Sequence, residues 1–356
     1  MIPAMNKKVI LSFVLLVSVA VSCMLTAPER TNLYLYTWSD YFDPELIARF
    51  EKENGCKVVI DTFDSNESAF AKLSAGATGY DLITPTSYFI PTMRNKGLLA
   101  EWSMDLLPNV ARNFDRRFSK LLVSDRMAHS VPYALSLTGV MYRRDSVPDG
   151  FDVEALGWSS VTNPVFKGRS SIFNDPREVI GCALRTAGFS ANSTNAQELS
   201  KALAVAKGWK RGILKMDNEM YKSAVASSEL LVAMGYNSDA MQIMQDDDGV
   251  SFAIPREGTT ASFDEFCLSA TAVHTNLAHA FVDFMYDPTN AARNVEYIYS
   301  IMPVKGIEEI VDPGLKNRGM VFPSDEILSR CELLKVLPPD ALKAYTAFWD
   351  ELKGAK

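Results

Sequence analysis

Histidine is scarce in this sequence of 356 residues, which has three: His129, His274 and His279. Because histidine is a common ligand of catalytic metals, this scarcity leaves little material for a metal centre. The sequence also lacks a G-x-S-x-G elbow, a G-x-x-x-x-G-K-[ST] phosphate loop, a G-x-G-x-x-G turn and an H-E-x-x-H motif. We therefore expect no metal, no cofactor and no enzymatic activity. The absence of these motifs does not exclude a two-carboxylate hydrolase, because such enzymes carry no short motif of this kind.

An excess of basic residues is missing as well. The chain has 36 Lys and Arg against 43 Asp and Glu, which gives a net charge of −7. Nucleic-acid-binding proteins normally carry a basic surface, so we expect no nucleic-acid partner. The acidic balance is compatible with a cationic partner, and the length suggests two domains.

Paired cysteines are absent beyond residue 23. Cys56, Cys182, Cys267 and Cys331 are isolated in the sequence, without C-x-x-C or zinc-site spacing. We expect buried single thiols. A disulfide in an oxidising compartment is the alternative, and the sequence does not indicate which cysteines it would pair.

The amino terminus has the pattern of an export signal. Two lysines precede an apolar run over residues 9–21, which is too short to span a bilayer comfortably. Its end, Ala20-Val21-Ser22-Cys23, resembles a bacterial lipoprotein signal, although Ala20 stands where such signals usually carry Leu. We expect removal of residues 1–22 and acylation of Cys23, which would anchor the protein to a membrane in the periplasm. Simple secretion and a retained anchor are the alternatives.

Strand-like and helix-like segments alternate through the rest of the chain. The predicted strands are 33–36, 57–63, 80–84, 137–142 and 250–254. The predicted helices are 44–54, 65–73, 88–95, 175–184, 196–209, 219–234, 276–285, 289–299 and 339–352. This alternation predicts two α/β lobes with a largely parallel sheet, joined without a flexible linker. The crevice between two such lobes is the usual place for a ligand.

Aromatic and acidic residues follow the first predicted strand. Trp38, Ser39, Asp40 and Tyr41 lie where the carboxyl end of a strand would face the crevice. Two aromatic faces beside a carboxylate suit an organic cation. The alternative is a surface turn in which Trp38 covers the core.

Two further segments have both a structural and a functional interpretation. Thr86 and Tyr88 follow the strand at 80–84 in the same way, although Thr86 could simply cap the next helix. Asp175 and Glu178 lie at the N-cap and third positions of a predicted helix, with proline between them. A capping box would explain both acids without any ligand.

Taken in order, these segments resemble the bacterial spermidine/putrescine-binding proteins, the extracytoplasmic receptors of polyamine ABC transporters. The similarity covers about residues 32–303. It is carried by segments 36–41, 65–67, 71–73, 80–88, 132–133, 175–179, 234–237 and 257–258, with Asp264 seven residues after Glu257. Each segment is weak alone, but their order and spacing are specific.

The resemblance implies a two-lobed periplasmic-binding-protein fold of the α/β class. The chain would cross the hinge several times, and the ligand would be enclosed in the cleft between the lobes. After the signal peptide, residues 1–22, one lobe would contain residues 23–137 and about 265–310. The other would contain residues 138–264 and about 311–356.

The resemblance also implies a set of ligand-binding residues. Aromatic rings would pack on the polyamine, and carboxylates and hydroxyls would meet its nitrogens. Residue by residue, the set is Trp38, Ser39, Asp40, Tyr41, Thr86, Tyr88, Asp175, Glu178, Tyr236, Ser262 and Asp264. Tyr236 stands where the family has Trp, and Asp264 matches an acid that commonly pairs with an ammonium.

Two residues depart from the family pattern. Ser262 stands in place of a Trp and Ser300 in place of a Tyr, although Phe263 or Tyr299 could fill the gap. Losing two aromatic walls leaves the choice between spermidine and putrescine open. No site residue is assigned beyond residue 303.

The leading interpretation is therefore a polyamine receptor that delivers its ligand to an ABC transporter permease. A receptor of the same fold for another small solute is the nearest alternative. The acids at positions 40, 175, 178 and 264 indicate that the solute is not an anion, because an anion-binding site would favour Arg or helix N-termini at such positions. An exposed lipoprotein for adhesion or sensing is a third possibility.

Overall fold

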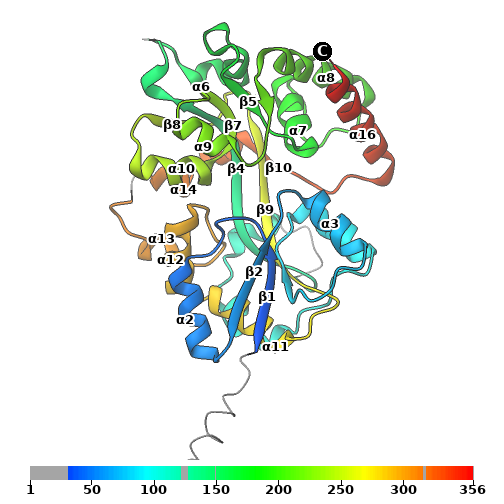
Figure 1. The fold of residues 1–356 in the computed structure, drawn as a ribbon, viewed down its shortest axis with the longest axis vertical. Helices are drawn as coiled ribbons and strands as arrows, with labels where there is room; N and C mark the ends of the chain where they lie inside the picture. Colours follow the sequence, from blue (N-terminus) through cyan, green and yellow to red (C-terminus); the bar gives the residue numbers. More distant parts are fainter. Residues whose placement is uncertain (1–30, 122–126, 149, 316–317, 356) are drawn as a thin grey trace, which may run out of the picture.

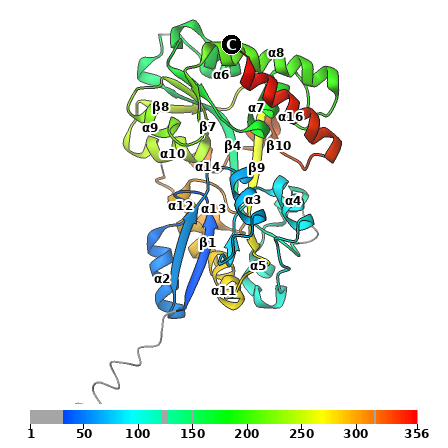
Figure 2. The same cartoon turned by 45° about the vertical axis from the view of Figure 1, so that its right-hand side comes forward.

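Two lobes, one above the other in Figure 1, make up the protein, whose computed structural model describes residues 31–121, 127–148, 150–315 and 318–355. The predicted signal peptide and Cys23 lie outside these residues. The long strands β4 (Val131–Arg143) and β9 (Thr259–Leu268) run lengthwise through both lobes. The same division is visible after a 45° turn in Figure 2.

The lower lobe in Figure 1 contains the first strands of the chain. They are β1 (Asn32–Thr37), β2 (Lys57–Thr62) and β3 (Leu82–Ile83). The helices are α2 (Pro44–Asn54), α3 (Asn66–Ser74), α4 (Ile90–Asn95), α5 (Pro108–Asn113), α11 (Thr275–Met285), α12 (Pro288–Ile298) and α13 (Ile307–Ile310). Short 3-10 helices cover Ser87–Phe89, Met104–Leu106 and Arg116–Leu121.

The upper lobe contains the central part of the chain and its carboxyl-terminal helix. Its strands are β5 (Ser170–Ile172), β6 (Lys215–Met216), β7 (Val232–Tyr236), β8 (Val250–Ala253) and β10 (Cys331–Leu333). The helices are α6 (Val153–Leu156), α7 (Pro176–Thr186), α8 (Ala196–Gly212), α9 (Tyr221–Ala226), α10 (Asn237–Asp246), α14 (Arg318–Val321), α15 (Asp325–Arg330) and α16 (Pro339–Gly354). Further 3-10 helices cover Arg144–Ser146, Gly157–Thr162 and Pro164–Phe166.

The strands form a mixed sheet in the order β2-β1-β3-β9-β4-β7-β5-β6. Outside this order, β8 pairs with β4 and β10 pairs with β9. β1 is parallel to β2 and β3, as the alternating pattern predicts. The expectation of a largely parallel sheet is wrong in the middle, because β4 is antiparallel to β7, β8 and β9. The long strands pass directly between the lobes there, without the crossover helix that parallel pairing requires.

Strand β4 changes partner where it leaves one lobe and enters the other. Residues up to Leu137 pair with β9, and pairing with β7 begins at Thr138. The chain crosses again along β9, and once more between α13 and α14. Several crossings of this kind form a hinge about which the lobes can move.

Helix α2 shows how local sequence sets an element's ends. The Asp43 side chain accepts a hydrogen bond from the Glu45 backbone N–H at 2.8 Å, and Pro44 begins the helix. Gly55 ends it with a φ of 63°, a left-handed conformation that suits glycine. The predicted helix 44–54 is therefore confirmed.

The predicted helix 219–234 is wrong. α9 ends at Ala226, Ser228 has a φ of 61°, and residues 232–236 form the buried strand β7. A strand buried on both faces has a continuous apolar sequence, so its periodicity does not distinguish it from a buried helix.

The four cysteines of the described residues are free thiols, and three of them are buried, as the sequence analysis expects of all four. Cys56, Cys182 and Cys267 are buried, and Cys331 is partly buried. Among the residues that the structure describes, no helix has the length and hydropathy of a membrane span.

Candidate ligand-binding site

A cavity of about 280 Å³ lies between the two lobes. All eleven residues that the sequence analysis assigns to the ligand line this cavity, so the structure brings together segments up to 226 positions apart, from Trp38 to Asp264. Their contact with a ligand stays a prediction. Eight lining residues were not predicted: Asp64, Asn66, Ser136, Asn218, Glu219, Lys222, Ser238 and Asp239.

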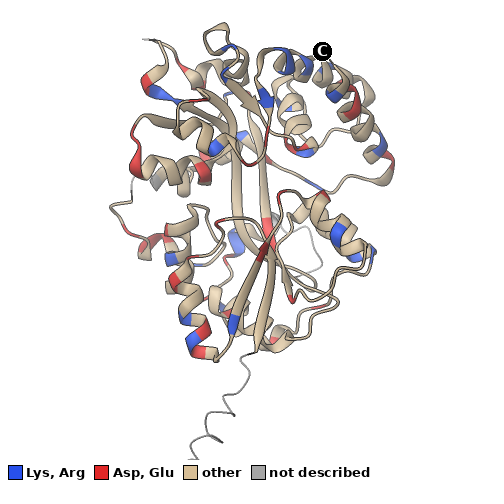
Figure 3. Cartoon of the chain, in the orientation of Figure 1, with Lys and Arg blue, Asp and Glu red and all other residues tan. Residues whose placement is uncertain are grey.

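The cavity is strongly acidic. Seven carboxylates line it, from Asp40, Asp64, Asp175, Glu178, Glu219, Asp239 and Asp264, and Lys222 is the one basic residue among the described lining residues. Figure 3 shows acidic positions in the middle of the molecule, including the centre of β9. Close carboxylates between low-dielectric walls repel one another, and a cation in the cavity relieves that repulsion.

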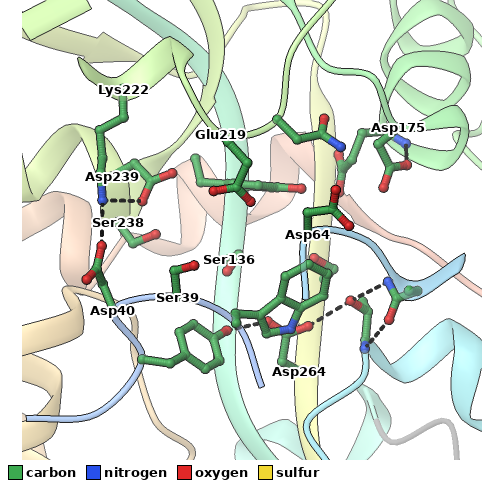
Figure 4. Close-up of a pocket in the computed structure, with 18 of the residues that line it drawn as sticks. Ser39, Asp40, Asp64, Ser136, Asp175, Glu219, Lys222, Ser238, Asp239 and Asp264 are labelled. Carbon is green, nitrogen blue, oxygen red and sulfur yellow. Dashed lines mark hydrogen bonds and ion pairs between the residues drawn. The ribbon is translucent and has the colours of Figure 1, made fainter. Parts of the chain in front are cut away.

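Asp264 is held by hydroxyl groups of the lower lobe. The Tyr41 hydroxyl donates to its Oδ2, and Thr86 Oγ1 donates to its Oδ1 at 2.7 Å. Asn66 supports this arrangement, because its amide donates to Thr86 Oγ1 at 3.0 Å and accepts from the Thr86 backbone N–H at 2.9 Å. Figure 4 shows this chain of hydrogen bonds leading to Asp264.

Burial governs the charge of Asp264. Its relative exposure is 7%, and desolvation raises its pKa to about 6, against the opposing effect of the hydrogen bonds from Tyr41 and Thr86. No ion pair of Asp264 occurs among the described residues. A ligand ammonium would supply the countercharge that this carboxylate lacks.

Asp175 and Glu178 approach the cavity from the start of α7. Asp175 Oδ1 is the helix N-cap, accepting from the backbone N–H groups of Arg177 at 2.8 Å and Glu178 at 3.0 Å. Glu178 does not complete a capping box. Its Oε2 accepts from Thr138 Oγ1 at 2.7 Å and from the Thr260 hydroxyl, so the two long strands hold it instead.

The carboxyl group of Glu178 is also buried without a countercharge in contact. Its relative exposure is 2%, and desolvation, with Asp175 nearby, raises its pKa to about 7. Burial likewise raises the pKa of Asp175. Both acids are therefore in surroundings that favour a bound cation.

Aromatic rings enclose the cavity from both lobes. Trp38 packs edge-on against Phe63 with 4.4 Å between ring centroids, and Tyr236 packs against Phe173 at 4.6 Å. Trp38 Nε1 is buried and has no hydrogen-bond partner among the described residues. These rings can contact the methylene chain or the cation of a ligand.

Neither Phe263 nor Tyr299 replaces the aromatic ring that the family has at the position of Ser262. Ser262 lines the cavity, whereas Phe263 packs edge-on against Phe118, because adjacent strand residues face opposite sides. Tyr299 ends α12 with a φ of 54° and does not line the cavity, nor does the buried Ser300. The site thus has fewer aromatic walls than the resemblance implies.

Lys222 occupies one end of the cavity. Its Nζ lies 3.2 Å from Asp40 Oδ2 and 3.8 Å from Asp239 Oδ1. No local signal in the sequence marked Lys222, because its ion pair with Asp40 joins distant segments of the chain, whereas Asp239 could have been found three residues after Tyr236. Among the described residues, no group of His, Cys, Asp or Glu has the arrangement of a metal site.

Known proteins resemble this chain over most of its length. The family model of the bacterial extracellular solute-binding proteins matches residues 45–316. The putrescine/cadaverine-binding protein of Pseudomonas aeruginosa is 31% identical over 363 residues, covering 98% of this chain and 99% of that protein.

Solved structures agree with this match. The spermidine/putrescine ABC transporter substrate-binding protein PotD of Streptococcus pneumoniae is 25% identical, with a TM-score of 0.76 over 91% of this chain and 98% of that one. The TpPotD lipoprotein of Treponema pallidum is 30% identical, with a TM-score of 0.79 over 90% of this chain and 99% of that one. The two-lobed fold is thereby confirmed, and the chain belongs to the bacterial extracellular solute-binding proteins.

Proposed function

We propose that this protein is an extracytoplasmic receptor that binds a polyamine and delivers it to the permease of an ABC transporter. It acts as a receptor and not as an enzyme. The observation that carries this proposal is the cavity itself, where seven carboxylates and several aromatic rings surround a space of about 280 Å³. The names of the Pseudomonas and Streptococcus relatives, which refer to putrescine, cadaverine and spermidine, support the same ligand class.

The proposal follows from the chemistry of the ligand. A polyamine is a flexible apolar chain with ammonium groups at fixed separations. Burying an ammonium is costly unless a carboxylate meets it, and separated acids at Asp264 and at Asp175 with Glu178 meet this requirement. The rings of Trp38 and Tyr236 would cover the methylene groups between the charges.

Calorimetry tests this function directly. We expect the protein, dialysed free of ligand, to release or absorb heat with at least one of putrescine, cadaverine, spermidine and spermine. The bound amine should be recovered chemically unchanged. If none of the four binds, the polyamine proposal is wrong, and a receptor for another solute or an adhesive or sensory lipoprotein takes its place.

We also propose that the protein acts in the periplasm, attached to a membrane through acylated Cys23. The proposal rests on the sequence of residues 20–23, and the Treponema relative is itself a lipoprotein. Two lipid chains would give a stable anchor. Cys23→Ser should therefore move the protein from the membrane fraction to the soluble fraction, and unchanged membrane association would contradict lipid attachment.

Finally, we propose that the lobes divide near residues 137, 264 and 310. The partner change of β4 after Leu137 supports the first boundary. The last boundary is supported by α14, which follows it: the Met320 backbone carbonyl accepts a hydrogen bond at 3.1 Å from the Asn237 side chain of α10, in the same upper lobe. Boundaries inside strands would let each lobe move as a body about β4 and β9.

A further inference from the structure

Lys222 carries the only positive charge among the described residues that line the cavity. It extends from α9, near the start of that short helix, toward the space between the lobes (Figure 4). Its ammonium Nζ donates to Gln242 Oε1 at 2.8 Å and to Asp40 Oδ2 at 3.2 Å, and Asp239 Oδ1 lies 3.8 Å away. Three oxygens thus surround a group that has three N–H donors.

The ion pair with Asp40 joins the two lobes. Asp40 follows β1 in the lower lobe, while α9 and α10 of the upper lobe provide Lys222 and Asp239. Asp40 has a φ of 54°, a conformation that aspartate tolerates better than most residues. The Tyr221 hydroxyl also donates to Asp239, so both acids at this end already have donors.

The acids at the other end of the cavity have no such partner. Asp264, Asp175 and Glu178 accept hydrogen bonds from hydroxyl or backbone groups, and among the described residues none of the three contacts a cation. In Figure 4, Lys222, Asp239 and Asp40 lie together on the left, Asp264 lies below the centre and Asp175 lies on the right. The unpaired negative charge is therefore concentrated at the centre and right.

From this arrangement we infer that Lys222 is a specificity-determining residue: its tethered ammonium takes the place of one ligand ammonium and selects short diamines over triamines. The inference rests on the proposed polyamine function. A diamine can place one ammonium at Asp264 and the other at Asp175 and Glu178. A third ammonium would have to reach Asp40 and Asp239, where it meets the positive charge of Lys222 and finds both carboxylates occupied.

Lys222→Met tests this inference, because methionine keeps much of the apolar stem and removes the charge. Titrations of the full chain, purified free of amines, would compare putrescine with spermidine. We expect the wild type to prefer putrescine. We expect the variant to shift the ratio of the two dissociation constants toward spermidine by at least about tenfold, which corresponds to ~1.4 kcal/mol.

Two matched variants complete the experiment. Lys222→Arg keeps the charge and should keep the wild-type preference. Lys207→Met removes a lysine whose side chain is also 30% exposed but pairs with Glu351 outside the cavity, and it should change neither constant. A folded Lys222→Met protein with the wild-type ratio would overturn the inference while leaving the polyamine function intact. Absence of binding by the wild type to either amine would overturn both.

Discussion

Asp264 has the surroundings that the proposed cationic ligand would require. Its carboxylate is buried, receives hydrogen bonds from Tyr41 and Thr86, and has a pKa raised to about 6 by desolvation. Hydroxyl donors orient the group but do not neutralise it. A ligand ammonium that reaches Asp264 therefore gains more than it would from an exposed carboxylate.

Replacing Asp264 by Ala should weaken polyamine binding by roughly 2–5 kcal/mol, the usual range when one partner of a buried charge pair is removed. Calorimetry gives the change. Glu265→Gln is the control, because Glu265 is also a buried acid on the same strand, accepts from Ser130 and does not line the cavity. Equal losses in the two variants, or an unchanged dissociation constant in folded Asp264→Ala, would remove Asp264 from the site.

Binding should also depend on pH through the buried acids. Desolvation raises the pKa of Asp264 from 3.8 to about 6 and that of Glu178 from 4.5 to about 7. The folded, ligand-free protein thus holds more protons than the unfolded chain between these values. The contribution of both acids to the free energy of unfolding is therefore greatest when the pH is below their ordinary pKa values. It is lost as the pH rises through their raised pKa values in the folded protein.

A cationic ligand needs the ionised acids, so its binding should release protons and weaken as the pH falls from about 7.5 to about 5.5. Calorimetry in two buffers of different ionisation enthalpy measures the protons released. Glu178→Gln should reduce their number. Affinity that stays constant over this range would contradict a role for these carboxylates in binding.

At the scale of elements, the start of α7 combines capping with the proposed binding. Asp175 accepts the first backbone N–H groups with one oxygen, and Glu178 is held by Thr138 and Thr260. Asp175→Asn should leave the ligand-free melting temperature nearly unchanged, because Asn caps helices about as well as Asp. Glu178→Gln should also fold, since its remaining amide oxygen can accept from both threonines.

Each of these two substitutions should nevertheless weaken polyamine binding at least about tenfold, or ~1.4 kcal/mol, because each removes an anion facing the cavity. Thermal melting without ligand and calorimetry with ligand separate the two roles. Early melting with undiminished binding would mean that the tetrad 175–178 serves the helix alone.

The elements also show which parts of the molecule the sequence can predict. Helix α2 was predictable because its cap, Pro44 and Gly55 are local signals. Strand β9 was missed, since all of its residues are buried and carry no alternating pattern. The same problem merged α9 with β7 into one predicted helix.

The candidate site could be predicted only as far as the resemblance extended. All eleven predicted residues line the cavity because ordered segments of the sequence match a family whose fold brings them together. Contacts specific to this chain were not predictable. The ion pair of Lys222 with Asp40 joins residues from different lobes, and neither local pattern nor spacing indicates that they meet.

At the scale of the whole molecule, the two lobes share the cavity and are joined by β4 and β9. Asp264 accepts hydrogen bonds from Tyr41 and Thr86 of the lower lobe, whereas Asp175 and Glu178 lie at the start of the upper-lobe helix α7. A ligand with a cation at each end can contact both groups at once. Such a ligand binds the closed arrangement more tightly and shifts the population toward it.

We therefore expect putrescine to reduce the radius of gyration of the protein in small-angle X-ray scattering. The melting temperature should rise as well, since ligand at ~100 times its dissociation constant adds about 2.7 kcal/mol of stability. Butylamine is the matched control, because it has the same four-carbon chain with a single ammonium. It can engage the acids of one lobe only, so it should compact the protein little even at saturation. Equal compaction by both amines would show that closure does not require a cation at each end, and binding of putrescine without compaction would show that the lobes do not close on it.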